Sequence, residues 1–463
     1  MATDKNHQDR ANNHLDVEHD AVFLQKVNGG TGPATSPSQP TDVPERGFRR
    51  TVHNFTPSWF IITMSTGICA ILLKQMPPPY DADWLRILAD VFFVFNISLF
   101  LLFSVITVIR YIWYPHIWHR VVRHPHQSLF LACFPVGLAT IINMIALVCA
   151  PAWGQGWAVF AWVLWWIVLV LALGTCFHLT FTIMTHRRHD LGEMSALYLI
   201  PIVAVVIVAT SGSLVATAIP GRENKLWTLY ISYILWGLGS PLSWIILTLY
   251  FLRLATYTPL KREVIVSLLL PIGPLGLEGF SLITLSKVAQ ELFLEVHAFP
   301  HSSPEAGSII TSVSILLGLL FWGFALVWFV IAVMMLAVSG GFPFNMGWWG
   351  FIFPVGVFTL LTGALGTSLE SKFMKILTCI LTAICIVMWL VVAAGTIYRS
   401  FTMEMFYSPC LGTNLYAKGR AGAAERQAEG KSTGAAKNGA DEEAINPSET
   451  TMVAQDSEEA KLR

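Results

Sequence analysis

The chain has 463 residues, of which 54% are hydrophobic and 13% are charged, and its formal net charge is zero. Soluble domains carry closer to a quarter charged residues, so this composition indicates a membrane protein. A neutral chain gives no electrostatic reason to expect nucleic-acid binding. The polar first 45 residues contain no apolar core of a signal peptide, and none is expected to be cleaved.

Ten apolar runs are long enough to cross a bilayer, which takes about 20 residues. They lie near 55–73, 85–112, 129–150, 157–183, 195–219, 226–252, 264–289, 306–338, 348–369 and 373–398. The sequence therefore predicts an all-α membrane protein with a ten-helix transport domain at residues 51–400. Polar composition predicts disordered tails at residues 1–50 and 401–463.

Basic residues in the short loops indicate the orientation of the chain in the membrane. Arg120 and Arg123 follow the second run, and Arg187 and Arg188 follow the fourth. Lys and Arg concentrate in cytoplasmic loops. Together with the even number of runs, this bias places both termini in the cytoplasm.

Prolines recur in alternate apolar runs. Pro135, Pro201, Pro271 and Pro354 fall in the third, fifth, seventh and ninth runs, and Pro57 opens the first. Proline removes a backbone donor and bends a helix. We interpret the even-numbered runs as straight. This repeated pair of helices predicts five bent inner helices around a central pore and five outer helices. Proline is also common in membrane helices generally, which leaves a purely structural interpretation open.

Two of these prolines share a longer motif. Residues 134–140 read FPVGLAT and residues 353–359 read FPVGVFT. A phenyl ring that projects into a narrow lumen closes it by steric blockage and by dewetting. Phe134 and Phe353 are therefore candidate gates, and the alternative is that each ring packs between helices.

Few polar groups lie within the predicted spans. Glu278 is an intramembrane carboxylate and hence a functional candidate. It is interpreted as a proton carrier, as a partner of Lys287, or as a structural hydrogen-bonding group. Lys and Arg are almost absent from the middle of the inner helices, so hydroxyls and amides are the expected groups along an anion path: Thr140, Asn143, Ser211 and Thr359.

Motifs for catalysis, nucleotide binding and metal binding are absent from the sequence. It contains no GxxxxGK[ST], HExxH, GxSxG or CxxC pattern. We therefore expect no enzymatic activity, no ATP hydrolysis, no metal and no cofactor.

The start of the first span resembles a known family. Residues 54–60 read NFTPSWF and residues 64–67 read MSTG, which is similar to fungal sulphite efflux pumps of the tellurite-resistance/dicarboxylate transporter family. The resemblance covers about residues 50–400. It implies a homotrimer in the membrane lipid, with one pore in each subunit. It also implies that a phenylalanine of the ninth helix occludes the pore. The stretch WWGFIFP at residues 348–354 assigns that role to Phe353, whereas Phe134 has no such support.

The resemblance implies export of sulphite or bisulphite across the plasma membrane of a fungal cell. Channel-like transport, uniport and proton coupling all remain open at this stage. A malate permease of the same family is the first alternative, although a dicarboxylate favours an Arg clamp that the inner helices lack. A receptor or scaffold that signals through its tails is the second.

Overall fold

The computed structural model describes residues 47–124, 126–186, 191–257, 265–295, 305–341, 343–402 and 405–406. The chain divides into two units, Met1–Arg50 and Thr51–Arg463. Of the first unit, only residues 47–50 are described, and Phe48–Arg50 form the start of helix α2 (Phe48–Asn54). The rest of the predicted tails, apart from residues 47–50, 401–402 and 405–406, lies outside the described residues, as do Arg187 and Arg188. All that follows concerns the second unit.

Ten helices in the described residues are long and apolar enough to span a membrane, which confirms the predicted fold class. Their limits agree with the predicted runs to within a few residues. The ten helices form an outer and an inner set. The outer set comprises α4 (Asp83–Trp113), α8 (Gln155–His186), α10 (Arg222–Thr256), α12 (Ala306–Val338) and α14 (Lys372–Phe401). The inner set comprises α3 (Phe60–Lys74), α6 (Cys133–Met144), α9 (Ile200–Ala218), α11 (Ile272–Glu295) and α13 (Trp349–Ser368).

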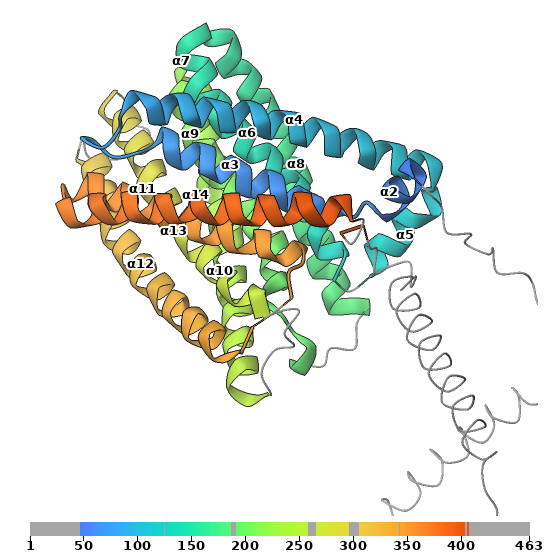
Figure 1. Ribbon diagram of the computed structural model, residues 1–463. Coiled ribbons are helices and arrows are strands. Elements are labelled where there is room, and N and C mark those ends of the chain that lie inside the picture. Colours follow the sequence, from blue (N-terminus) through green and yellow to red (C-terminus); the bar gives the residue numbers. More distant parts are fainter. Residues whose placement is uncertain are drawn as a thin grey trace, which may run out of the picture. The chain divides into compact units, whose positions relative to one another are not determined.

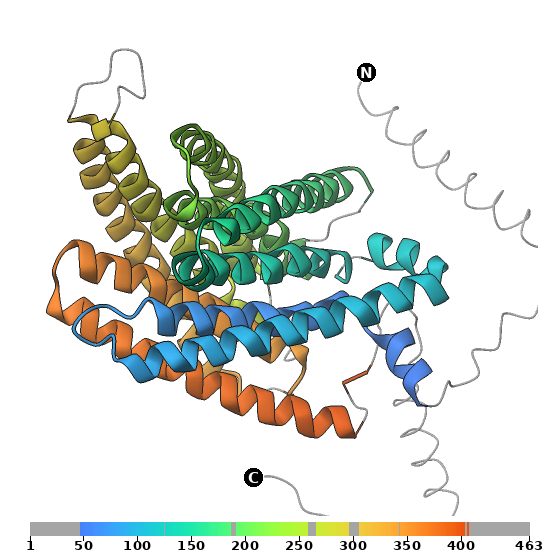
Figure 2. The ribbon, with the colours of Figure 1, turned by 90° about the horizontal axis from the view of Figure 1, so that it is seen from above.

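Burial alternates along the chain and separates the two sets. In the odd-numbered spans 72–100% of the apolar stretch is buried, against 17–33% in the even-numbered spans. Each inner helix contacts two others, in the order α3, α6, α9, α11, α13 and back to α3, so the five form a closed ring. Each outer helix packs against the inner helix that precedes it in the chain. Figures 1 and 2 show the pairs of neighbouring helices around this ring.

Every inner helix is preceded by a short 3₁₀ turn. The turns are Pro57–Trp59, Ser128–Ala132, Ala196–Leu199, Ile265–Leu269 and Met346–Trp348. Residues from all five turns line one cavity, so the inner helices all begin at the same end of the ring and run parallel. The third span also continues through a π-helical turn, Ile145–Cys149, into the short helix α7 (Ala150–Trp153).

The recurring prolines stand close to these junctions. Pro201 is the second residue of α9, Pro135 the third of α6 and Pro354 the sixth of α13, while Pro271 directly precedes α11. Proline is well tolerated in the first turn because the N–H groups there have no partner within the helix. Three of these four positions therefore mark where an α-helix starts, and Pro354 alone lies inside its helix.

One sequence-based interpretation is wrong. The even-numbered spans were interpreted as straight, without the proline of a bent helix, but Pro241 lies inside the outer helix α10. Lipid-exposed helices tolerate proline when nearby side chains and local adjustments of the helix satisfy the freed carbonyl groups. Proline alone therefore does not distinguish inner from outer helices. The distinction comes from burial.

Glycines allow the inner helices to approach closely. A Cβ atom on Gly276 of α11 would lie 2.9 Å from the backbone N of Phe358 in α13. A Cβ atom on Gly356 of α13 would lie 2.6 Å from Cγ1 of Ile68 in α3. Both distances are shorter than non-bonded carbon contacts allow, so only glycine fits. The inner helices are thus tightly packed just beyond the cavity that the five 3₁₀ turns line.

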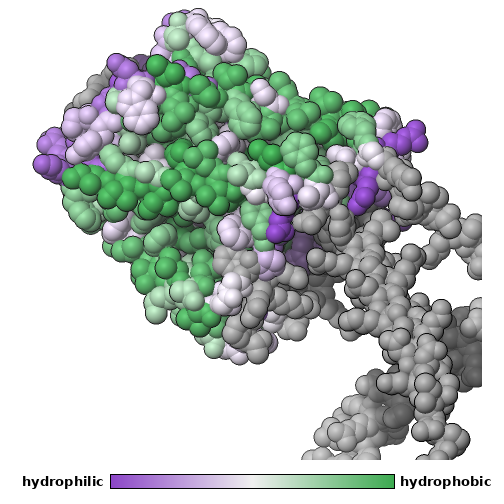
Figure 3. Space-filling model, viewed as in Figure 1, coloured by the Kyte–Doolittle hydropathy of each residue, from purple (hydrophilic) through white to green (hydrophobic). Residues whose placement is uncertain are grey.

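The outside of the helices is apolar. Figure 3 shows hydrophobic residues over the helices of the visible face, with hydrophilic residues concentrated at the ends. Exposed large residues include Phe95 on α4, Ile167 on α8 and Val327 on α12. A surface of this kind is stable in lipid and not in water.

We predict that Gly276→Val destabilises the protein by about 1–3 kcal/mol, the usual effect of overpacking, because the new side chain meets the backbone of α13. The measurement is the melting temperature of the purified protein in detergent. Gly174→Val is the matched control, since a Cβ atom on Gly174 of α8 meets nothing within 4 Å. Equal melting temperatures for the two variants would contradict the close packing of α11 against α13.

Candidate functional site

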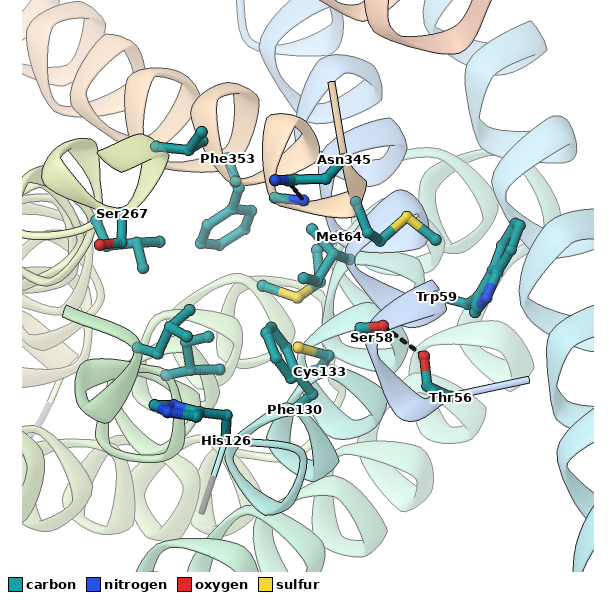
Figure 4. A pocket seen from close by; sticks show the side chains of 18 of the residues that line it. Thr56, Ser58, Trp59, Met64, His126, Phe130, Cys133, Ser267, Asn345 and Phe353 are labelled. Carbon is teal, nitrogen blue, oxygen red and sulfur yellow. Dashed lines mark hydrogen bonds between the residues drawn. The ribbon is translucent and has the colours of Figure 1, made fainter. Parts of the chain in front are cut away.

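A cavity of about 430 Å³ lies where the five inner helices begin, and we call it the N-terminal vestibule. Each inner helix, or the 3₁₀ turn before it, contributes lining residues. Figure 4 shows this site with its labelled side chains. Examples are Met64, Cys133, Ile200, Ser267 and Phe353, one from each of the five segments. The vestibule is therefore formed by all five inner helices together, and no single helix forms it alone.

The vestibule favours negative charge. The first N–H groups of a helix lack partners within the helix, and its N-terminus carries about half a positive charge. Five such ends converge here. Arg399, at the end of α14, also lines the vestibule and donates to the carbonyl oxygen of Phe344 at 3.1 Å. No Asp or Glu is among the described residues that line it.

Two buried polar side chains of the vestibule retain hydrogen-bonding capacity. Gln127 and Ser267 are each 6% exposed. The Oε1 atom of Gln127 and the Oγ atom of Ser267 have no hydrogen-bond partner in the protein. Buried polar atoms are usually paired, so unpaired ones identify a place where a polar solute or water is favoured. Both residues line the vestibule.

Phe353 lies at the inner end of the vestibule. Its ring is 6% exposed and points from the second turn of α13 into the cavity, as Figure 4 shows. Gly350 and Pro354 on the same helix also line the cavity. Immediately beyond, Gly356 packs against Ile68 of α3. The inner helices are thus tightly packed in the turn that follows Phe353.

A second cavity, of about 200 Å³, lies nearer the C-terminal ends of α3, α11 and α13, and we call it the C-terminal cavity. On α13 its lining begins at Thr359, six residues after Phe353. At about 1.5 Å per residue, this separation is roughly 9 Å along the helix. Two cavities therefore lie on either side of Phe353, with a closed segment between them.

Sequence comparison assigns the chain to a family. The family model described as SLAC1, voltage-dependent anion channel, matches residues 54–397. The chain belongs to the SLAC1 family. This finding confirms the resemblance predicted from the start of the first span.

Several named proteins are similar to this SLAC1-family chain. The sulfite efflux pump SSU1 of Arthroderma benhamiae is 40% identical over 355 residues, which cover 77% of this chain and 93% of that protein. The SSU1 of Saccharomyces cerevisiae is 23% identical, over 66% of this chain and 78% of its own length. The malic acid transport protein of Schizosaccharomyces pombe is 24% identical, over 73% of this chain and 76% of its own length.

The second FPVG phenylalanine has different surroundings from the first. The ring of Phe134 lies 5.1 Å from the rings of Phe60 on α3 and Phe100 on α4, measured between centroids. It is half-buried and lines neither the N-terminal vestibule nor the C-terminal cavity, but a separate cavity of about 470 Å³ that residues of α4, α6 and α8 border. It packs toward an outer helix, as the packing interpretation expects, and its position is unlike that of Phe353.

The predicted path residues are not brought together. Thr140 faces the outer helix α4, where its Oγ1 accepts a hydrogen bond from Asn96 Nδ2 at 3.2 Å. Thr359 lines the C-terminal cavity. Asn143 and Ser211 are buried on α6 and α9, and their Oδ1 and Oγ atoms have no partner in the protein. Of the four, only Thr359 lies against one of the two cavities.

Glu278 is fully buried and points toward the outer helix α10. The Ser243 hydroxyl donates to its Oε1, and Trp244 Nε1 donates to its Oε2 at 2.7 Å. Trp236 Nε1 donates to its backbone oxygen at 3.1 Å. Lys287 is not a partner. The carboxylate thus joins α11 to α10 and lines neither cavity, which favours the structural interpretation of this residue.

Sequence reasoning missed several groups that line the cavities. Gln127, Ser267 and Arg399 were not singled out, because they lie in turns or at a helix end and no motif marks them. Lys287 was considered only as a partner of Glu278, yet it lines the C-terminal cavity. Its spacing offered a signal, since Phe280, Thr284 and Lys287 recur at helical intervals on one face of α11.

We predict that Glu278→Ala lowers the stability of the protein and leaves its transport selectivity unchanged. The change removes the acceptor of the Trp244 indole N–H, at a cost of up to about 1–3 kcal/mol, while the Ser243 hydroxyl can still donate to the carbonyl oxygen of Ser240 at 2.8 Å. The melting temperature in detergent and the flux per folded molecule are the two measurements. Ser243→Ala removes one donor and should have a smaller effect on stability. A stable Glu278→Ala protein with altered ion selectivity would place the carboxylate on the transport path.

Proposed function

We propose that the protein exports sulphite or bisulphite from the cytoplasm across the plasma membrane, without ATP hydrolysis, through a path inside each subunit. The observation that carries this proposal is the position of Phe353 between the N-terminal vestibule and the C-terminal cavity, which residues of α3, α11, α13 and the outer helix α14 line. The substrate class rests on the similarity to the sulfite efflux pump SSU1 of Arthroderma benhamiae. Family membership supports an anion as the transported species.

The path begins at the N-terminal vestibule. We place this end of the ring in the cytoplasm, together with both chain termini. Arg120 and Arg123 end the short helix α5 (Pro115–Arg123), and Arg253 and Arg399 lie in the last turns of α10 and α14 at this end. At the opposite end, Arg86 is paired with Asp81 at 2.9 Å and with Asp83 at 3.3 Å. Lys74, Arg222, Lys225, Lys372 and Lys375 also lie at that opposite end, so the placement rests on a modest excess of basic residues at the vestibule end, in the direction of the cytoplasmic bias of membrane proteins.

The anion then passes Phe353, which acts as the gate. A phenyl ring offers no hydrogen bond to a hydrated ion, and the closed segment beyond it excludes water. Rotation of the ring away from the axis opens a route toward the C-terminal cavity. Phe134, packed against Phe60 and Phe100, shapes the inner ring and does not gate.

The driving force is the membrane potential. A potential of 100 mV, negative inside, favours the exit of one negative charge by about 2.3 kcal/mol. Export against a modest concentration gradient therefore requires neither ATP nor a nucleotide-binding domain. We propose that the protein assembles as a homotrimer in the lipid bilayer, with one independent path per subunit.

Malate is the second candidate substrate, because the chain is similar to the malic acid transport protein of Schizosaccharomyces pombe. A dicarboxylate calls for two cationic groups or a bidentate Arg. The described lining of the two cavities contains one Lys and one Arg, on opposite sides of Phe353. This distribution favours a smaller anion of low charge. A receptor or scaffold has no supporting observation among the described residues.

We predict that the protein reconstituted in liposomes carries sulphite faster than malate. The measurement is the flux of each anion with an imposed membrane potential, with and without a pH gradient. Sulphite flux equal to that of empty vesicles would reject the proposed substrate. Because pH also sets the fraction present as bisulphite, proton movement measured together with sulphite flux would show proton coupling in place of simple uniport.

We predict that Phe353→Ala raises the basal sulphite flux severalfold because it removes the barrier between the two cavities. Phe134→Ala is the matched control, since it alters the other FPVG motif in a packed position. It should affect stability and leave the basal flux close to that of the unmodified protein. An unchanged flux in folded Phe353→Ala protein would mean that Phe353 is a packing residue.

A further inference from the structure

The C-terminal cavity has a composition that suits an anion. Its polar lining consists of hydroxyls, one amide and one ammonium group, and no Asp or Glu is among its described residues. The residues in question are Gln75, Thr284, Lys287, Thr359, Thr367 and Thr378. At about 200 Å³ the cavity is smaller than typical pockets for drug-sized ligands. It therefore fits a small ion with some of its water.

Most of the hydroxyl groups are already engaged within the protein. Thr359 donates to the carbonyl oxygen of Val355 at 2.7 Å, and Thr378 donates to that of Met374 at 2.8 Å. The Oγ1 atom of Thr284 accepts a hydrogen bond from Ser213 at 2.9 Å. The donors that remain for a solute are the Lys287 ammonium and the Gln75 side-chain amide.

Lys287 is not neutralised by a neighbouring carboxylate. Among the described residues, the ion pairs of 4.0 Å or less are those of Arg86 with Asp81 and Asp83. Glu291, one turn further along α11, is exposed and forms no ion pair with Lys287. The lysine thus presents a net positive charge to the cavity.

The direction of the inner helices makes this charge necessary. Because α3, α11 and α13 run parallel, their C-terminal ends converge on the side of the C-terminal cavity. Each helix C-terminus carries about half a negative charge, which repels an anion. An ion attracted into the N-terminal vestibule would therefore meet an unfavourable field on the way out. One ammonium group at this end offsets that field.

We propose that Lys287, with the Gln75 amide, forms an exit-side binding site for a small monovalent oxyanion and sets the anion selectivity of the path. The inference rests on the proposed transport function and adds to it a second site, on the far side of Phe353. Lys287 contacts the passing ion through its ammonium group. Gln75, the residue that follows α3, contributes its side-chain amide.

The test compares variants of the full-length protein in liposomes. Lys287→Gln replaces the charged ammonium group with a neutral amide, Lys287→Arg keeps the charge, and Lys287→Glu reverses it. Lys372→Gln is the control, because Lys372 is an exposed first residue of α14 and does not line the cavity. The readouts are sulphite flux and the anion-to-cation permeability ratio, obtained from the reversal potential in a sodium sulphite gradient.

We expect Lys287→Gln to lower the anion-to-cation permeability ratio by about tenfold. This is the size of the effect of one short-range contact between two unit charges where water partly screens them. Lys287→Arg should restore the ratio, and Lys287→Glu should lower it further. The difference should shrink in concentrated salt, because screening weakens a contact between charges and does not affect a packing defect. Lys372→Gln should match the unmodified protein.

The outcomes separate this inference from the proposed substrate. If the unmodified protein carries sulphite and Lys287→Gln leaves the permeability ratio and the flux unchanged, the exit-side site is rejected and sulphite export stands. If the unmodified protein carries nitrate or chloride but no sulphite, and Lys287→Gln lowers that flux with rescue by Lys287→Arg, the substrate is rejected and the site stands. A loss of flux that Lys287→Arg fails to restore would also reject the site.

Discussion

The parallel direction of the five inner helices is the constraint on which the rest of the structure depends. Each inner helix is followed by an outer helix that returns the chain to the same end, so every inner helix starts where the previous one started. Five positive helix ends meet at the N-terminal vestibule and five negative ends at the opposite side. The two sides of the path therefore need different side chains, and Lys287 supplies the cation at the end where the helices oppose an anion.

Much of the fold could be predicted from the sequence, because the bilayer imposes length and hydrophobicity on each span. The helix-pair repeat was visible in the alternating prolines. What the prolines do was less visible: most of them start α-helices after a 3₁₀ turn, and Pro241 interrupts an outer helix. Local sequence indicates where a backbone donor is dispensable. Whether a helix belongs to the inner or the outer set is seen from how much of it is buried, and burial is known only from the assembled structure.

The candidate site was less predictable than the fold, since identical motifs lie in different surroundings. Phe134 and Phe353 share the FPVG context, yet one packs against Phe60 and Phe100 while the other points into a cavity. Spacing along the chain also left three interpretations of Glu278 open, one of them a pairing with Lys287. Nine residues separate it from Lys287, whereas its partners, Ser243 and Trp244, come from another helix. Contacts between distant segments decide such roles, and a single sequence does not contain them.

The distribution of charge along the path bears on which form of the substrate is carried. The penalty for removing an ion from water rises with the square of its charge, so a dianion loses about four times as much solvation as a monoanion of the same size. Doubling the charge only doubles the drive from the membrane potential. The exit has one ammonium group, and neither described cavity lining contains a carboxylate. The ammonium group can therefore balance a single negative charge. The proposed path is therefore better matched to bisulphite, as the proposed substrate, than to the sulphite dianion or to malate.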